Sequence, residues 1–214
     1  MFAPLARGVV SVLDMVLPQR CVSCNVFGDD LCDACCSRFL TSAPVVHTDH
    51  PSMLSVTAIG SHTGGLRDAI LALKFRQRRR VAIRLGTLLG RCLRRRAGYL
   101  VAVPLHAARL RERGFNQALE IANGIASVCD IPIADGVIVR HRATAPQSGL
   151  AQRDRRGNVE HAFEAGPNTR RVRGQTIVLV DDVMTTGATL AACASVLNDS
   201  GAAHVRAAVL ALKL

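Results

Sequence analysis

Two adjacent carboxylates follow an aliphatic run near the C-terminal end of the sequence. Residues 177–180 are Ile-Val-Leu-Val, and Asp181 and Asp182 come directly after them. Charged side chains at the end of a buried strand are costly unless a ligand or a partner uses them. Their oxygens can accept hydrogen bonds from the two hydroxyls of a ribose, or help to hold a magnesium ion.

Small and hydroxyl-bearing residues come next, at the expected start of a helix. They are Thr185, Thr186, Gly187, Ala188 and Thr189. Backbone N–H groups at a helix N-terminus attract phosphate, and glycine lets a phosphate approach closely. Helix capping without any ligand would explain the threonines but not the acidic pair. Residues 177–190 therefore predict a site for a ribose 5-phosphate.

The cysteines suggest a second kind of site, because five of the eight lie between residues 21 and 36. Cys21 and Cys24 form one C-x-x-C pair, and Cys32 and Cys35 form another. Each pair can present two thiolates from one tight turn, and two such turns complete a tetrahedral site for structural zinc. A disulfide or redox pair is the competing interpretation, which a cytoplasmic chain disfavours. Cys36 is an alternative to Cys35 as the fourth ligand.

The chain is strongly basic, with a formal net charge of +11 that comes largely from arginine. A basic surface favours anionic partners such as phosphates or nucleic acid, although it also simply keeps a protein soluble. We find no apolar run of about 18 residues that would span a membrane. Residues 1–17 read as an amphipathic helix rather than a signal peptide, so we expect a cytoplasmic protein.

Aliphatic strands alternate with amphipathic helices from residue 56 onward. Strands are expected at 56–59, 99–103, 137–139, 176–180 and 205–211, and helices at 66–73, 83–93, 116–128 and 188–198. This alternation predicts a doubly wound α/β fold with a parallel sheet. Residues 41–55 read as a linker. We therefore expect a helix and zinc module at residues 1–45 and a main domain at residues 56–214.

Two arginine-rich stretches lie outside these expected elements. Residues 105–114 follow Pro104, which stops a strand, and are expected to form a loop. Residues 140–176 contain few apolar side chains and read as a long excursion. Long polar loops in compact domains are often functional lids, so both stretches are candidates to approach a ligand.

Residues 177–190 resemble the signature of the type I phosphoribosyltransferases, in which four aliphatic residues precede two acids and a Thr-Thr-Gly-x-Thr loop. Further segments narrow the resemblance: Leu-Lys-Phe at 73–75, Val-Pro-Leu-His at 103–106, Arg-Leu-Arg-Glu-Arg-Gly-Phe-Asn-Gln at 109–117, and residues 147–163. With the cysteine module in front, the chain resembles the ComF family, also called GntX-like, of phosphoribosyltransferase-like competence proteins. The resemblance implies a type I phosphoribosyltransferase-like sheet with a small N-terminal zinc-binding module.

The resemblance also implies roles for individual residues. Asp181 and Asp182 would hold the ribose hydroxyls of phosphoribosyl pyrophosphate, and residues 185–189 would hold its 5-phosphate. Residues 104–113 would meet the pyrophosphate at a strand end. The binding residues expected there are Pro104, Leu105 and His106. Arg109, Arg111 and Arg113 could neutralise the charge that grows as the glycosidic bond breaks, with Arg109 and Arg113 as the catalytic candidates, unless they are only a salt-bridged or solvated helix start.

These assignments favour a transferase that displaces pyrophosphate from phosphoribosyl pyrophosphate, with magnesium bridging the diphosphate and an acceptor that the sequence does not identify. Purine salvage is disfavoured, because purine salvage members of the wider family often carry a carboxylate base where this chain has Thr185. The family resemblance further links the chain to natural competence and DNA uptake.

Two alternatives remain open. One is a non-catalytic component of the transformation machinery that senses a nucleotide in the same pocket and binds single-stranded DNA on its basic surface. The scarcity of aromatic residues counts against base stacking as the source of that binding. The other treats the pocket as regulatory and the zinc module as a docking surface for another competence protein.

Overall fold

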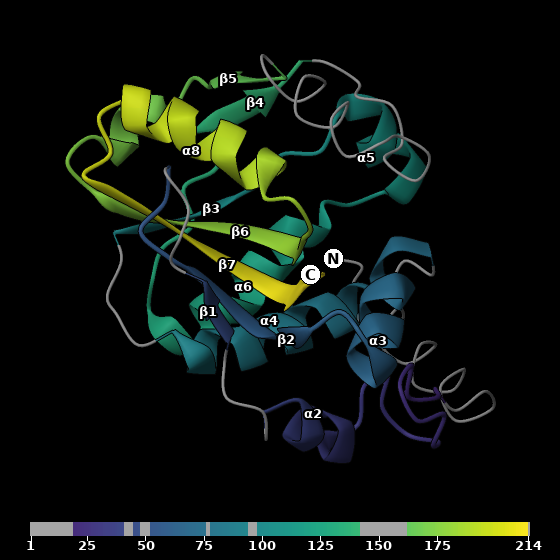
Figure 1. Ribbon diagram of the computed structural model, residues 1–214. Helices are drawn as coiled ribbons and strands as arrows, with labels where there is room; N and C mark the ends of the chain where they lie inside the picture. The colour runs from purple at the N-terminus through teal and green to yellow at the C-terminus, as the bar shows by residue number, and fades with distance from the viewer. Residues whose placement is uncertain are drawn as a thin grey trace, which may run out of the picture.

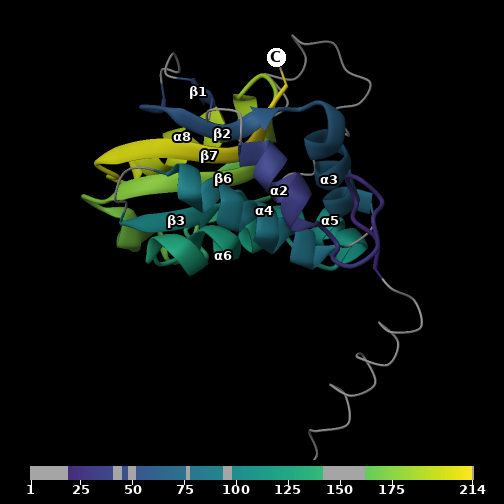
Figure 2. The same ribbon diagram turned by 90° about the horizontal axis from the view of Figure 1, so that it is seen from below.

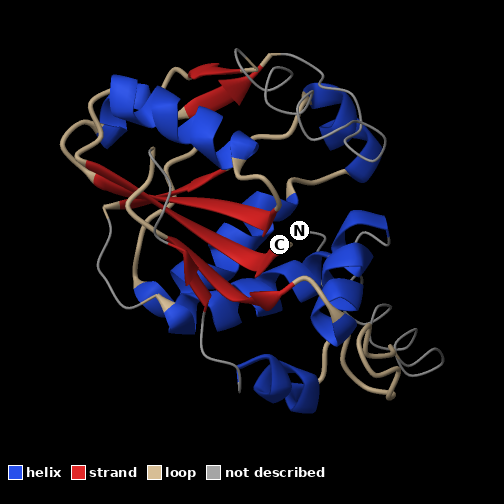
Figure 3. Ribbon diagram, in the orientation of Figure 1, coloured by secondary structure: helices blue, strands red, loops and turns tan. Residues whose placement is uncertain are grey.

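The structure is a computed structural model, and it describes residues 19–40, 45–47, 52–75, 78–93, 98–141 and 162–213. In this part of the chain a five-stranded sheet separates two layers (Figures 1 and 3). The helix expected at residues 1–17 and most of the excursion expected at 140–176, namely 142–161, lie outside the described residues.

The sheet confirms the predicted α/β fold, because its strands run parallel except at one edge. In sheet order the strands are β1 (Val45–His47), β2 (Val56–Ser61), β7 (His204–Leu212), β6 (Thr176–Met184) and β3 (Tyr99–Ala102). β1 pairs antiparallel with β2. The interpretation of residues 41–55 as a linker is therefore wrong at residues 45–47, where consecutive valines, which favour extended backbone, add an edge strand.

Helices cover both faces of the sheet. Three of them pack together on one face, as Figure 2 shows from below: α3 (Gly64–Phe75), α4 (Arg79–Cys92) and α6 (Gln117–Cys129). The other face is covered by α8 (Ala188–Asp199) and by a ribbon of two short strands, β4 (Ile138–Arg140) and β5 (Phe163–Ala165). The chain thus builds the three-layer arrangement that parallel strands buried on both faces require.

The side chains of β6 alternate between the two layers. Val178 and Val180 pack in the cluster on the α4 and α6 side, whereas Ile177 and Leu179 pack in the cluster on the α8 side. All four side chains are buried. This alternation follows from the two-residue period of a strand.

Two glycines let the backbones of α4 and α6 come into direct contact. A Cβ on Gly86 would collide with the carbonyl oxygen of Ile121, and a Cβ on Gly124 would collide with that of Ile83. Both obstacles are backbone atoms, which cannot move aside as a flexible side chain can. The pair of glycines therefore sets the distance between the helices that cover this face.

Three short elements depart from the sequence expectations. α5 (Ala107–Arg113) occupies the stretch expected to be a loop, and β5 and the 3₁₀ helix η1 (Thr169–Val172) lie within the expected excursion. α5 forms because its ends are capped: the His106 side chain accepts a hydrogen bond from the N–H of Ala108, and Gly114 follows in the left-handed conformation at φ 73°. β5 forms by pairing with β4.

The cysteine module packs directly on the main sheet and its helices. It ends in α2 (Asp33–Leu40), and its buried residues Cys21, Leu31 and Cys35 belong to the same hydrophobic cluster as residues of α3 and α4. The division into units at residues 1–45 and 56–214 stays a prediction. The shared cluster does mean that the module and the sheet stabilise each other.

Candidate functional site: the cleft and the cysteine cluster

The predicted carboxylates lie where β6 extends beyond β3. The two strands pair from Tyr99 and Ile177 to Ala102 and Val180, and the N–H of Val103 then donates to the carbonyl of Val180 at 2.9 Å. Pro104 has no N–H with which to continue the ladder. β6 continues to Met184 alongside β7, so the strand expected at 176–180 was predicted too short. The sheet opens between β3 and β6 at the carboxyl ends of the strands, where ligands bind in such folds.

A cleft of about 550 Å³ lies at this opening. Its walls come from the loop after β3, from α5, from the end of β6 and from the start of α8. The predicted site residues that line it are Pro104, Leu105, Arg109, Arg113, Asp181, Asp182, Thr185, Thr186, Gly187, Ala188 and Thr189. His106 does not line the cleft, because its ring caps α5 through the N–H of Ala108 at 3.2 Å. The structure therefore brings together all but one of the residues predicted for the sugar-phosphate site.

The two carboxylates have different surroundings. Asp182 is buried, with 6% of its surface exposed, and its Oδ2 accepts a hydrogen bond from Nε2 of Gln117 on α6 at 3.1 Å. Asp181 is half-buried, and its Oδ1 accepts a hydrogen bond from the N–H of Asp182 at 2.8 Å. Asp182 is thus held by the α6 layer, while Asp181 is the more accessible of the two.

The small residues after the carboxylates form the turn into α8. Gly187 adopts the left-handed conformation at φ 75°, which favours glycine, and its carbonyl accepts the N–H of Ala191 at 2.8 Å. The hydroxyl of Thr186 accepts the N–H of Ala188 at 3.4 Å. The remaining first-turn N–H groups of a helix have no partner within it, which makes this turn suited to a phosphate.

Arginines form the basic wall of the cleft. Arg109 and Arg113 reach it from α5, and Arg140 reaches it from β4. Burial lowers the pKa of Arg140, and the positive charge of Arg109 lowers it further. The guanidinium of Arg140 also lies over the ring of Phe163, 5.1 Å from its centroid. Like charges gathered in one cleft favour an anionic ligand between them.

Sequence reasoning missed several residues of the cleft. They are His62, Glu112, Gln117, Arg140 and Lys213. His62 and Lys213 each directly follow a parallel strand, β2 and β7. Position after a strand was therefore the available signal for these two, because the carboxyl ends of parallel strands meet at one edge.

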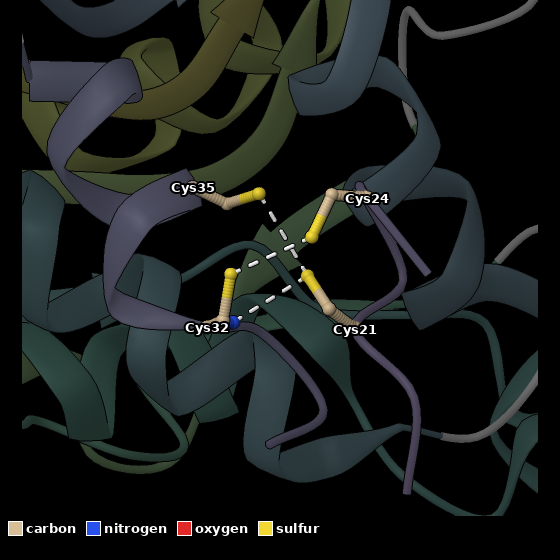
Figure 4. Close-up of side chains that lie close together, drawn as sticks. All are labelled: Cys21, Cys24, Cys32 and Cys35. Carbon is tan, nitrogen blue, oxygen red and sulfur yellow. Dashed lines mark hydrogen bonds between the residues drawn. The ribbon is translucent and has the colours of Figure 1, made fainter. Parts of the chain in front are cut away.

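The four predicted cysteine ligands come together in the N-terminal module. The sulfur atoms of Cys21, Cys24, Cys32 and Cys35 all lie within 4.8 Å of one another (Figure 4). The Cys21 and Cys35 sulfurs are 3.8 Å apart, and the Cys24 and Cys32 sulfurs are 3.6 Å apart. Thiolates at about 2.3 Å from a tetrahedral zinc lie roughly 3.8 Å from one another. The cluster therefore has the donors and the spacing of a structural zinc site, with Cys35 rather than Cys36 as its fourth member.

Hydrogen bonds support two of these sulfurs. The guanidinium of Arg38 donates to Sγ of Cys35 at 2.8 Å, and the backbone N–H of Cys32 donates to Sγ of Cys21 at 3.4 Å. Such donors offset the negative charge of four thiolates around a divalent ion. Cys36 has a separate environment, because its sulfur accepts a hydrogen bond from Nε of Arg84 at 3.3 Å, and burial raises its pKa.

Arginines at the start of α4 bind carboxylates of their own chain. Arg78 bonds to Asp30 in the cysteine module, and Arg79 bonds to Glu120 on α6. Arg78 therefore joins the module to the start of α4, and Arg79 joins α4 to α6. The run at residues 78–80 acts in part as a structural anchor.

Among the described residues, we find no helix with the length and apolar character needed to cross a membrane.

Comparison with known proteins shows that part of this site lies within a recognised domain. The model of the phosphoribosyl transferase domain matches residues 116–214, which include α6, β6 and the turn into α8. DNA utilization protein YhgH is 34% identical in Salmonella typhi and 33% identical in Escherichia coli K12, each over 164 residues, 73% of this chain and 71% of theirs. Competence protein F of Haemophilus influenzae is 33% identical over 107 residues, 50% of this chain and 47% of its own. This chain thus spans about half the length of that relative.

A solved structure is also similar in its backbone. Glutamine phosphoribosylpyrophosphate amidotransferase from B. subtilis, in complex with ADP and GMP, superimposes with a TM-score of 0.42 and 23% sequence identity. The superposition covers 60% of this chain and 25% of that one.

Proposed function

The chain belongs to the ComF family of phosphoribosyltransferase-like proteins, and we propose that its cleft binds phosphoribosyl pyrophosphate and displaces pyrophosphate from it. One observation supports this proposal most directly. Two carboxylates, a glycine and threonine turn at the start of a helix, and three arginines line the same cleft. Each group suits one part of that ligand: the ribose hydroxyls, the 5-phosphate and the diphosphate.

The sugar phosphate would be held between β6 and α8. The turn at residues 185–189 receives the 5-phosphate, because the helix start offers N–H groups and Gly187 lets the phosphate approach closely. Asp181 and Asp182 accept hydrogen bonds from the ribose hydroxyls. These contacts fix the orientation of the C1 atom toward the basic wall of the cleft.

The basic wall would stabilise the leaving group. The bond between C1 and the pyrophosphate oxygen breaks, pyrophosphate leaves with the electron pair, and a nucleophilic atom of the acceptor bonds to C1. Arg109 and Arg113 donate to the oxygens on which negative charge grows. Arg140, which reaches the cleft from β4, adds a third positive charge to this region.

Magnesium suits the carboxylates present in the cleft. Asp181 is half-buried and lines the cleft, so its oxygens are of the type and accessibility that the ion prefers. When bound with the ligand, magnesium would neutralise part of the diphosphate charge. Thr185 stands where purine salvage enzymes of the wider family often carry a carboxylate base, so we propose an acceptor other than a purine base.

The test compares two arginines of the same helix. Arg109 lines the cleft, whereas Arg111 does not, and both belong to α5. Purified variants are incubated with phosphoribosyl pyrophosphate, magnesium and a panel of nitrogenous acceptors, and pyrophosphate release is measured. We expect Arg109→Ala to lower the rate by about a hundredfold and Arg111→Ala to change it by less than about threefold.

Calorimetry with phosphoribosyl pyrophosphate and magnesium separates binding from catalysis. Binding without release for any acceptor would refute the transferase proposal and leave a binding protein. Failure of the wild-type chain to bind would refute the proposal as a whole.

Binding of single-stranded DNA is the competing function, and the names of the competence and DNA utilization relatives fit it. The arginine run at residues 78–80 supports it less than its charge suggests, because Arg78 and Arg79 are paired with Asp30 and Glu120. Oligonucleotide binding that falls steeply with salt and persists when phosphoribosyl pyrophosphate saturates the cleft would favour this function instead.

A further inference from the structure

Gln117 donates a side-chain hydrogen bond to a carboxylate of the cleft. It is the first residue of α6, only 5% of its surface is exposed, and its Nε2 donates to Oδ2 of Asp182 at 3.1 Å. An ionised carboxylate only accepts hydrogen bonds, so the amide nitrogen must face Asp182. A bond to Oδ2 restricts the rotation of this carboxylate, and with it the direction in which Oδ1 accepts.

The residue before Gln117 fastens the start of α6 to the neighbouring strand. Nδ2 of Asn116 donates to the carbonyl of Val103 at 3.1 Å, while its Oδ1 accepts the N–H of Ala118 at 3.0 Å and caps the helix. Consecutive residues therefore bridge the opening of the sheet, with Asn116 bonded to the end of β3 and Gln117 bonded to β6. The start of α6, which carries Gln117, is therefore fastened beside β3, and the carboxamide of Gln117 reaches β6.

The start of α6 also attracts Asp182. The N-terminal end of a helix carries a partial positive charge, and α6 begins beside this carboxylate. This attraction adds to the hydrogen bond from Gln117 in holding the carboxylate against α6.

Fold stability alone does not explain a glutamine at this position. Its Oε1 atom is buried and has no hydrogen-bond partner in the described part of the chain. A buried acceptor without a partner lowers the stability of the fold, so such atoms are expected where function requires the residue. An apolar side chain of similar size would avoid that cost, but it would not orient Asp182.

We propose that Gln117 is a positioning residue that orients Asp182 to accept hydrogen bonds from the hydroxyls of a bound ribose 5-phosphate. This inference rests on the proposed binding of a sugar phosphate in the cleft. It assigns recognition of the sugar to Gln117 and Asp182, and recognition of the phosphate to the turn at residues 185–189. Ribose 5-phosphate and inorganic phosphate should therefore respond differently when Gln117 changes.

The test uses Gln117→Glu, with both ligands and at two pH values. At pH 8 two adjacent carboxylates repel, Asp182 loses the amide donor at position 117, and we expect ribose 5-phosphate to bind about tenfold more weakly than to wild type. The affinity for inorganic phosphate should fall by less than about threefold. The repulsion raises the pKa of the pair, so at pH 5.5 the pair retains a proton that restores the donor. The ratio of variant to wild-type affinity for ribose 5-phosphate should then return toward one.

Two further variants keep the result interpretable. Gln175→Glu makes the same change at an exposed side chain that precedes β6 and lies outside the cleft, and it should leave both affinities unchanged. Gln117→Met removes the donor without adding charge, so it should weaken ribose 5-phosphate at both pH values. Circular dichroism checks that each variant is folded.

The possible outcomes are distinct. Wild-type affinity for ribose 5-phosphate in Gln117→Glu at pH 8, or in Gln117→Met, would overturn the role of Gln117 and leave the proposed function standing. An equal loss for ribose 5-phosphate and inorganic phosphate would also overturn it. Absence of ribose 5-phosphate binding by the wild-type chain would overturn both the role and the proposed function.

Discussion

The guanidinium of Arg79, at the first residue of α4, donates through Nε to the carboxylate of Glu120 in the first turn of α6 at 2.9 Å. Glu120 is 5% exposed, whereas Arg79 is mostly exposed. Arg79 also lies over the ring of Phe115, 5.7 Å from its centroid. This pair joins the two helices next to the segment that carries Asn116 and Gln117.

Removing Arg79 should destabilise the fold more than removing its neighbour. Arg79→Ala leaves the buried carboxylate of Glu120 without its guanidinium, and we expect the free energy of unfolding to fall by about 1 to 3 kcal/mol. Arg80→Ala alters an exposed side chain and should change it by less than about 0.5 kcal/mol. Urea denaturation measures both. Equal losses would show that the pair with Glu120 contributes nothing specific.

The close approach of α4 and α6 leads to a second prediction. Gly124→Ala would put a methyl group against the carbonyl oxygen of Ile83, so the helices must separate. Overpacking of this kind costs about 1 to 3 kcal/mol, and more where backbone must move. Val128→Ala, on the same helix at a side chain that is 45% exposed, is the control. We expect thermal unfolding to show a large loss for Gly124→Ala only.

Features with a local signal could be predicted from the sequence. The parallel sheet followed from aliphatic runs separated by amphipathic helices, and the resemblance to the ComF family is confirmed by the relatives. The C-x-x-C spacing identified the four sulfurs that gather in the module. Each strand, helix and cysteine pair is encoded in a short stretch of sequence, so periodicity or spacing reveals it.

Features that depend on distant contacts could not be predicted. The bond between Gln117 and Asp182 joins residues 65 positions apart, and Arg140 enters the cleft only because β4 pairs with β5 beside it. α5 has no apolar periodicity and no buried residue, and it forms through its caps. β6 extends past Val180 because β7 continues beside it, which hydropathy at the two aspartates does not indicate.

Arg38 leads to a prediction about the cysteine cluster. Its guanidinium lies 2.8 Å from Sγ of Cys35, where its positive charge offsets the negative charge of the thiolates. We expect Arg38→Ala to bind zinc about 10-fold to 100-fold more weakly, measured by competition with a chromophoric chelator. Arg67→Ala, an exposed change on α3, should keep wild-type affinity. Equal affinities in all three proteins would mean that Arg38 does not support the site.

The fourth zinc ligand can be decided by a pair of adjacent cysteines. Cys35 belongs to the group of four sulfurs, whereas Cys36 accepts a hydrogen bond from Arg84, and both are buried on α2. Serine keeps the size of either side chain and an oxygen that can accept a hydrogen bond, but it is a much poorer zinc ligand than a thiolate.

Cys35→Ser should therefore lose most of its zinc, while Cys36→Ser should retain about one ion per chain, as metal analysis of the purified proteins would show. Because the module shares its hydrophobic cluster with α3 and α4, loss of the metal should also lower the unfolding temperature of the whole chain. Cys36→Ser should unfold close to wild type, since its contact with Arg84 persists. Zinc loss in Cys36→Ser but not in Cys35→Ser would show that Cys36, and not Cys35, is the fourth zinc ligand. Full zinc content in both variants would refute a site built on four cysteines.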